Sequence, residues 1–379
     1  MKVCILTYSI DKKMGGPARS VLSLANGLEQ QGCKVTLCTI ESDEMNTEGV
    51  LNEGVNLVTL AYHKQKASIE YFFSHNHFDL VHIQNIWLPF YHWAILILQK
   101  NHTPYIISPR GSLDHWCLNY KRFKKTIALY LYQRKDIDNA SAIQTTSEIE
   151  AKHVHNLHFK SPISVIPNGI DVSTYSCRTE QSYAKIKKQV LFLSRIHPKK
   201  GIEVLIDAWE LVHKEFPEWK VIIAGNGEER YIHKLSTRIE SKHMTDCISI
   251  VPPIYGEEKR KLYCESSIFV LPSHSESFGM VIAEALACGV PVITSSFTPW
   301  KILNDSGSGW SIDLSVENLA TSLANALSLN PKVLFDMGQR GRELIENNYN
   351  YTTVAQKNLQ LYNWVLNKGT YSFYEDEES

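Results

Sequence analysis

The sequence has no excess of charge of either sign. Its 379 residues include 39 Lys and Arg and 40 Asp and Glu, which gives a formal net charge of −1. A protein that follows a phosphate backbone normally carries a clear excess of basic residues, so we expect no nucleic-acid partner. Any anion-binding site must therefore be local.

The sequence also lacks cysteine pairs spaced as in metal sites, and it lacks long apolar runs. The eight cysteines never form a CxxC, and several lie in apolar runs, where free Cys behaves as a small hydrophobe. This predicts a reducing compartment and no zinc site. No apolar run approaches the ~18 residues that span a bilayer, and no signal-like segment precedes the first predicted strand at Lys2. We therefore expect a cytoplasmic protein.

Short apolar runs alternate with segments of helical length along the whole chain. Strands are predicted at 2–8, 34–40, 79–83, 105–108, 142–145 and 164–167, and then at 189–194, 220–224, 247–251, 267–271 and 291–294. Such alternation predicts mainly parallel sheets that are covered by helices on both faces. Because single cores stop growing near ~250 to 300 residues, we expect two doubly wound, Rossmann-like α/β domains.

The domain boundaries follow from composition. Residues 1–172 form the first predicted domain, the polar, Lys-rich segment 173–188 is the linker, and 189–351 form the second domain. The helix predicted at about 352–368 is a candidate to pack back onto the first domain. The tail at 370–379, which ends in acidic residues, is predicted to be disordered.

The most informative stretch runs from Pro272 to Val292 and reads PSHSESFGMVIAEALACGVPV. A strand leads into a polar loop with Glu276, and a helix begins near Gly279, whose missing side chain lets a phosphate approach the free helix amides. Glu276 and Glu284 are spaced to accept hydrogen bonds from sugar hydroxyls beside that phosphate. Taken as an isolated pair, the same carboxylates also fit an acidic helix start and a surface Glu.

This Glu-x7-Glu stretch resembles the donor-site signature of retaining GT-B glycosyltransferases of family 4. The resemblance covers nearly the whole chain and includes Gly15-Gly16, Thr146-Ser-Glu148, the segment 166–171, Ser194-Arg195, Lys199-Lys-Gly201 and the segment 224–227. It implies metal-independent transfer from a UDP- or GDP-linked sugar to a saccharide or lipid-linked saccharide, as in bacterial surface-polysaccharide and lipopolysaccharide biosynthesis. No cofactor is expected.

The resemblance also implies roles for individual residues. Arg195 and Lys200 would neutralise the donor diphosphate in place of a metal ion and, with Glu276, make up the catalytic set. The predicted donor-binding residues are Gly16, Arg195, Lys200, Gly225, Glu276, Ser277, Phe278, Gly279, Met280, Val281 and Glu284.

The sequence departs from the family at the expected catalytic centre. Many relatives carry a His near the position of Arg110, and a second His is frequent where Gln84 stands. Arg110 cannot serve as a base at neutral pH, but it can bind an anionic acceptor or donor phosphates; a structural role is the alternative. The acceptor-side candidates are His82, Asn85, Trp87, Arg110 and His115.

Two further motifs have simpler explanations. Asp136-Ile-Asp138 matches a metal-binding Asp-x-Asp, but it lies in a helical segment and is interpreted as a solvated helix face. The basic segment 121–135 also carries Phe123, Ile127, Tyr130 and Leu131. It is a candidate for peripheral membrane contact, although a helix that packs its apolar side inward is favoured.

Three rival functions remain open. One is a GT-B relative with other chemistry, such as inverting transfer, epimerisation or hydrolysis. Another is a non-catalytic nucleotide-sugar binding protein, which the missing His positions favour. The third is an NAD-dependent oxidoreductase, but Gly225-Asn-Gly227 lacks the third glycine of the dinucleotide fingerprint, because Arg230 stands in its place.

Overall fold

The chain divides into two compact units. The computed structural model describes residues 1–376 except 12–13, 43–44, 46–50, 120–121, 176–177 and 180–185. Unit 1 comprises Met1–Ile170 and Tyr349–Ser379, and unit 2 comprises Asp171–Asn348. The domain edges expected from sequence, 172 and 351, lie two and three residues from these divisions. Much of the expected linker lies outside the described residues.

Unit 1 contains a parallel sheet of seven strands in the order β3-β2-β1-β4-β5-β6-β7. The strands are β1 (Lys2–Thr7), β2 (Lys34–Ile40), β3 (Asn56–Leu60), β4 (Leu80–Gln84), β5 (Tyr105–Ser108), β6 (Ala142–Thr145) and β7 (Ile163–Val165). Edge strand β3 was not predicted, because three of its five residues are exposed and it shows no continuous apolar run.

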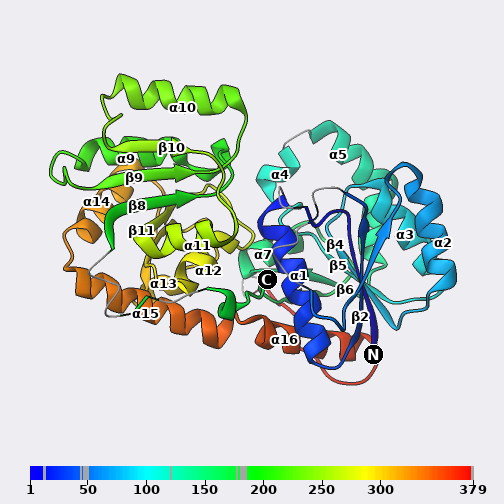
Figure 1. The fold of residues 1–379 in the computed structure, drawn as a ribbon. Helices are drawn as coiled ribbons and strands as arrows, with labels where there is room; N and C mark the ends of the chain where they lie inside the picture. Colours follow the sequence, from blue (N-terminus) through cyan, green and yellow to red (C-terminus); the bar gives the residue numbers. More distant parts are fainter. Residues whose placement is uncertain are drawn as a thin grey trace. The chain divides into compact units, whose positions relative to one another are not determined.

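Helices cover both faces of this sheet. They are α1 (Gly16–Gln30), α2 (Gln65–His75), α3 (Pro89–Lys100), α4 (His115–Asn119), α5 (Arg122–Ala128), α6 (Arg134–Asp138), α7 (Glu148–His155) and α16 (Tyr351–Val365), with a 3-10 turn at Tyr62–Lys64 and a π-helical turn, η3, at Leu129–Gln133. Helices α1 and α16 lie side by side and share one apolar core with the sheet (Figure 1). The second core lies on the other face and includes residues of α2, α3 and α7.

The C-terminal segment after α16 also belongs to unit 1. The hydroxyls of Tyr371 and Ser164 lie 2.6 Å apart, and Tyr374 N donates to Ile163 O at 2.8 Å. Phe373 packs edge-on against Trp364. These contacts differ from the predicted disorder of 370–379, because aromatic residues anchor the segment ahead of its acidic end. Residues 377–379 lie outside the described residues.

Unit 2 contains a parallel sheet of six strands in the order β10-β9-β8-β11-β12-β13. Its strands are β8 (Lys187–Leu193), β9 (Lys220–Ala224), β10 (Ile248–Val251), β11 (Ser266–Leu271), β12 (Val292–Ser295) and β13 (Gly309–Ile312). Its helices are α9 (Ile202–Val212), α10 (Glu229–Ser241), α11 (Gly256–Glu265), α12 (Met280–Ala287), α13 (Ile302–Asp305), α14 (Val316–Leu327) and α15 (Pro331–Asn348), with 3-10 turns at Val172–Thr174 and Pro198–Lys200. Short edge strand β13 was not predicted.

Both units thus show the predicted α/β architecture. In open parallel sheets, ligands bind beyond the carboxyl ends of the strands, so this edge of each sheet is where functional side chains are sought.

Candidate functional site

Three loops meet at the carboxyl edge of the unit 2 sheet, after β8, β11 and β12. His274 N donates to Lys199 O at 2.8 Å, and Glu276 N donates to Phe297 O at 3.2 Å. The Ser295 hydroxyl donates to the Ser273 carbonyl. These bonds fix the loop that carries Glu276 against its two neighbours.

Lys200 and Glu276 form an ion pair at this edge. The Lys200 ammonium contacts Glu276 Oε1, which also accepts a 2.8 Å hydrogen bond from Ser273 Oγ. Only 13% of the Lys200 side chain and 11% of the Glu276 side chain are exposed. The structure therefore brings together two residues that are 76 positions apart and were predicted to share one site.

Gly201 explains how Lys200 reaches that position. It has φ +68° and joins the 3-10 turn to α9, and a Cβ built on it would lie 1.9 Å from the Pro272 carbonyl oxygen. Only glycine permits so close an approach. The turn with Lys200 is thereby pressed against the loop after β11.

Arg195 follows β8 and is exposed. Within the described part of the chain it makes no ion pair. A Cβ on Gly225 would lie 1.9 Å from the carbonyl oxygen of Ser194, so Gly225 packs the loop after β9 against the residue before Arg195. The close approach explains why a glycine stands at position 225, where it lets the two loops pack and so supports the loop that carries Arg195.

Helix α12 begins without a side-chain cap. Its N-cap residue Gly279 has φ +81° and, as a glycine, supplies no side-chain cap to the first amides. The Phe278 carbonyl accepts a 2.6 Å bond from the indole nitrogen of buried Trp300, which holds the turn in place. Residues 277–281 therefore present the start of α12 at the same edge as Arg195, and helix starts of this kind bind anions.

Glu284 is more deeply placed than a surface Glu. Its side chain is 1% exposed, and Oε2 lies 2.5 Å from the Lys259 ammonium and accepts a 3.0 Å bond from the Tyr263 hydroxyl. Burial and the neighbouring Glu284 carboxylate raise the pKa of Tyr263. The surface alternative is therefore wrong for Glu284, and its predicted contact with a sugar hydroxyl of the donor stays a prediction.

His82 is a core residue of unit 1. It is fully buried on β4, Nδ1 lies 2.6 Å from the Tyr362 hydroxyl, and Nε2 lies 2.7 Å from Ser108 Oγ. Ser108 Oγ in turn lies 3.3 Å from Gln144 Oε1. Burial lowers the pKa of His82 well below its usual value. The prediction of His82 as an acceptor-side residue is therefore wrong, because β4 is a central strand covered on both faces.

Arg110 lies just beyond β5 with φ +56°. Its Nε donates to Gln84 Oε1 at 2.8 Å, Nη2 contacts the same oxygen, and Nη1 contacts Asn168 Oδ1. Burial lowers the pKa of Arg110 to about 10, and nearby Glu150 opposes that shift. Arg110 is therefore still a cation at neutral pH.

The loops beside Arg110 are shaped by unusual backbone. Asn85 and Trp87, after β4, have φ of +98° and +79°. The Asn85 side chain accepts bonds from Ile86 N at 2.8 Å and Ser112 Oγ at 2.6 Å, and the Trp87 indole donates to Ser112 O at 3.1 Å. Non-glycine residues in this conformation are strained and concentrate at functional sites.

His115 opens α4 and is exposed. No hydrogen bond between it and Arg110 is seen, so its acceptor-side role stays a prediction. Gly16 is the first residue of α1, after Gly15 with φ +64°. Its predicted contact with the donor likewise stays a prediction.

Asp136 corrects the interpretation of Asp136-Ile-Asp138 as a solvated face. The Asp136 side chain is buried, and His92 Nδ1 lies 2.8 Å from Oδ2. Burial raises the pKa of Asp136 to about 6. Asp138 Oδ1 accepts a bond from Lys160 N at 2.9 Å. Both carboxylates have structural partners, and among the described residues no group of three or more His, Cys, Asp or Glu is placed to hold a metal ion.

The apolar side chains of α5 and η3 point outward, against the favoured inward packing. Phe123 is 79% exposed, Tyr130 89%, Leu131 69% and Ile127 42%. We call these four residues the apolar stripe. Its basic neighbour Lys121 and the side chain of Arg122 lie outside the described residues. No helix in the described part is long and apolar enough to cross a bilayer.

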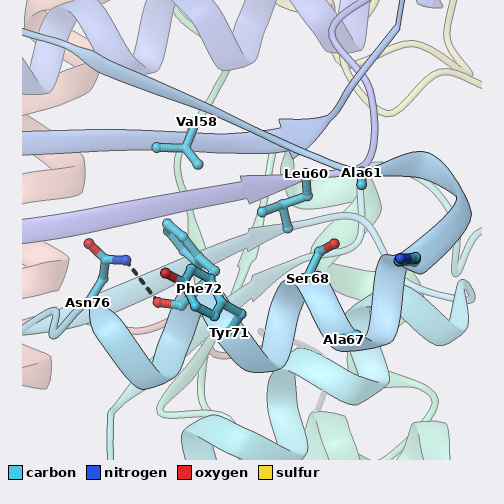
Figure 2. A pocket seen from close by; sticks show the side chains of 9 residues that line it. Val58, Leu60, Ala61, Ala67, Ser68, Tyr71, Phe72 and Asn76 are labelled. Atoms are coloured by element: carbon cyan, nitrogen blue, oxygen red, sulfur yellow. Dashed lines mark hydrogen bonds between the residues drawn. The ribbon is translucent and has the colours of Figure 1, made fainter.

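Two pockets of unit 1 lie away from the predicted residues. One of about 450 Å³ lies between β3 and α2, where Val58 and Leu60 face Ser68 and Phe72 (Figure 2). The other, of about 930 Å³, lies between α2 and α3. Neither is lined by a predicted donor or acceptor residue.

Two family models match the chain: Glycosyltransferase Family 4 over residues 14–174 and Glycosyl transferases group 1 over residues 178–344. The chain belongs to the family-4 glycosyltransferases of the GT-B type. The resemblance noted in the sequence is thereby confirmed over both units.

Solved structures confirm the GT-B fold of this family-4 member. Anabaena HepE, crystallised with UDP and glucose, superposes with a TM-score of 0.77 at 16% identity, covering 95% of this chain and 99% of that one. Sucrose-phosphate synthase from Thermosynechococcus elongatus gives 0.78 at 18% identity, covering 97% and 99%.

Relatives with named activities align with this chain over only part of their length. The chain is 24% identical over 243 residues to D-inositol 3-phosphate glycosyltransferase of Kineococcus radiotolerans, covering 58% of this chain and 54% of the relative. The chain thus spans about half the length of that relative. It is 24% identical over 289 residues to GDP-mannose:cellobiosyl-diphosphopolyprenol alpha-mannosyltransferase of Xanthomonas oryzae pv. oryzae, covering 76% and 74%.

Four supporting residues of this family-4 chain escaped the sequence-based prediction. Asn168 lies in the segment 166–171 and Ser273 in the stretch from Pro272 to Val292. Membership in these family motifs was the sequence signal that could have identified both residues. Lys259 lies in a polar helix, α11, with no pattern that marks it. Glu150 is buried and accepts bonds from Gly111 N at 2.5 Å and Thr146 N at 2.8 Å, tying the turn after Arg110 to α7.

Proposed function

We propose that this protein transfers a sugar from a UDP- or GDP-linked donor to a saccharide or lipid-linked saccharide acceptor. The observation that carries the proposal is the cluster at the carboxyl edge of the unit 2 sheet. There an ion pair, Lys200–Glu276, an uncapped helix start at Gly279, and Arg195, which has no ion-pair partner among the described residues, converge. Such a cluster can bind a diphosphate and a sugar hydroxyl side by side.

The chemistry follows from these groups. The departing nucleotide gains negative charge, which Arg195, Lys200 and the amides of α12 stabilise, so that no metal ion is required. Donor binding replaces the Lys200–Glu276 pair with two contacts, one from Lys200 to phosphate and one from a sugar hydroxyl to Glu276. A donor phosphate oxygen takes the proton of the acceptor hydroxyl, which attacks the face from which the nucleotide leaves. The anomeric configuration is thereby retained.

A binding screen tests the donor site. Thermal shift with UDP-sugars, GDP-sugars and NAD should show the largest stabilisation with a nucleotide sugar, and Glu276→Ala and Arg195→Ala should each reduce it. Unchanged binding in both variants, or a stronger effect of NAD, would overturn the proposed site. Proton NMR of the product distinguishes retention from inversion and from hydrolysis, and turnover in excess EDTA tests metal independence.

We further propose that the apolar stripe contacts an anionic membrane surface at which a lipid-linked acceptor is presented. Four exposed apolar side chains beside exposed Lys124 and Lys135 suit such a surface. The name of the Xanthomonas relative, with its diphosphopolyprenol acceptor, supports a lipid-linked substrate. This proposal places the protein at the cytoplasmic membrane face.

Vesicle sedimentation tests the membrane contact. A Phe123→Ser, Tyr130→Ser, Leu131→Ser variant should lose binding to vesicles that contain anionic lipid. Leu211→Ser, which changes a 57% exposed residue of unit 2, is the matched control and should bind like the wild type. Equal partitioning of the triple variant and the wild type would contradict the contact.

A further inference from the structure

Arg110 is a cation whose bonded partners are all uncharged. Its guanidinium donates through Nε and Nη2 to the amide oxygen of Gln84 and through Nη1 to the amide oxygen of Asn168. A guanidinium has five N–H donors, so two are left beyond these three. Neither remaining donor meets a side-chain or backbone acceptor among the described residues, and Arg110 as a residue is half-buried.

The carboxylate of Glu150 does not neutralise this charge by contact. Glu150 is close enough to raise the pKa of Arg110, but its two oxygens accept bonds from Gly111 N, Thr146 N and Thr146 Oγ1. Glu150 therefore holds the turn that follows Arg110, while the positive charge remains available to a ligand.

Gln84 adds a further donor in excess. The residue is 2% exposed, and its buried Nε2 has no hydrogen-bond partner in the described part of the chain. The amide cannot simply be turned over, because that would place its NH2 group against the guanidinium of Arg110. Buried polar groups are almost always paired, so this orphan indicates that the cluster is built around donors that await an acceptor.

The backbone holds Arg110 in place for this purpose. Arg110, Asn85 and Trp87 all have positive φ at the carboxyl ends of neighbouring strands β5 and β4. This is the sheet edge where ligands of doubly wound folds bind. Strain of this kind persists only where surrounding contacts enforce it, here the bonds from Gln84, Asn168 and Ser112.

We infer that Arg110, supported by Gln84 and Asn168, binds a phosphate group of the acceptor. The inference rests on the proposed function and narrows it, since it requires an acceptor that carries phosphate. The donor diphosphate has its own cations, Arg195 and Lys200, in unit 2. A planar guanidinium with two free N–H groups matches the oxygens of a phosphate, and charge-assisted bonds of this type are strong.

The test measures binding of inorganic phosphate to the full chain by ³¹P NMR, with UDP and GDP both present in excess to occupy the donor site. Wild type should bind phosphate, and Arg110→Gln should bind it about tenfold or more weakly, the loss expected for a charge-assisted hydrogen bond. Arg110→Lys should retain part of the affinity, because it keeps the charge without the fork. Lys100→Gln, which removes an exposed cation of the same unit at the end of α3, is the control and should leave phosphate binding within about twofold.

Three outcomes would overturn the inference. Wild type could fail to bind phosphate beyond the nucleotides, Arg110→Gln could bind phosphate as wild type does, or Arg110→Gln could weaken UDP and GDP as much as it weakens phosphate. The last outcome would assign Arg110 to the donor. Failure of nucleotide binding in the wild type, with phosphate binding intact and dependent on Arg110, would instead remove the proposed function and keep the anion site. Circular dichroism of Arg110→Gln checks its fold, and the wild type and Arg110→Lys still decide the inference if that variant unfolds.

Discussion

Replacing Gln84 with Glu should make the protein more stable and less able to bind an anion. The change exchanges the orphaned amide nitrogen for oxygen in a side chain of the same shape, while the oxygen that faces Arg110 is kept. A buried donor without a partner costs about 1 to 3 kcal/mol, and the variant removes this donor. The new carboxylate also pairs with the guanidinium, which offsets the cost of burying its charge.

We expect a net gain of about 1 kcal/mol, which for a unit of this size corresponds to a rise in Tm of roughly 2 to 4 °C. The same carboxylate cancels the charge that attracts phosphate. At about 4 Å that attraction is worth roughly 1 kcal/mol in water and 4 kcal/mol at an effective dielectric constant of 20, so phosphate affinity should fall by about tenfold or more.

Gln144→Glu is the matched control for Gln84→Glu. Gln144 is equally buried on β6, but its Nε2 donates to Ile166 O at 3.3 Å and its Oε1 accepts from Ser108. A carboxylate there would face a carbonyl oxygen with no cation in contact, so Tm should fall. Thermal unfolding and phosphate titration of both variants are the assays. Equal losses of stability in the two variants, or wild-type phosphate affinity in Gln84→Glu, would refute the reasoning.

Other predictions concern the buried charges and one glycine. Glu284→Gln removes the buried carboxylate that pairs with Lys259 and should lower the free energy of unfolding of unit 2 by about 3 to 5 kcal/mol in denaturant titrations. Adding Lys259→Met to the same chain should restore part of this loss, and no recovery would argue against a paired charge. Because burial raises the pKa of Asp136 to about 6, its contribution to stability should be lost as pH rises from about 4 through 6. Asp136→Asn should flatten the fall of Tm over that range, and an unchanged slope would contradict the assignment. Gly201→Ala places a Cβ 1.9 Å from a backbone carbonyl at φ +68° and should lower Tm and weaken donor binding together, whereas a fully active variant would show that the contact is dispensable.

The sheets and the donor edge were predictable because their signals are local. Continuous apolar runs mark buried parallel strands, and the stretch from Pro272 to Val292 carries a strand, a loop and a helix start in order. The edge strands β3 and β13 were missed because neither has a continuous apolar run. Three of the five residues of β3 are exposed, and β13 is a short, mostly half-buried strand with the sequence GWSI.

The errors concern residues whose partners are distant in sequence. His82 is buried by Tyr362, 280 positions later, and nothing near His82 signals that contact. Glu284 is sequestered by Lys259 on another helix, and Asp136 by His92. Such pairs depend on how helices pack over the sheet, which no local pattern encodes. The apolar stripe was misjudged for a related reason, since an amphipathic pattern does not say whether a covering element exists.

The two crossings between the units lie next to each other. Ile170 N donates to Tyr349 O at 2.9 Å, and Tyr351 N donates to Ile170 O at 3.0 Å, so the chain leaves unit 1 and returns to it at hydrogen-bonded neighbours. Helix α16, which packs on α1 and supplies Tyr362 to His82, is made only after all of unit 2 has been synthesised. During synthesis on the ribosome, unit 2 can therefore complete its fold first, whereas the core of unit 1 stays incomplete until α16 has been made.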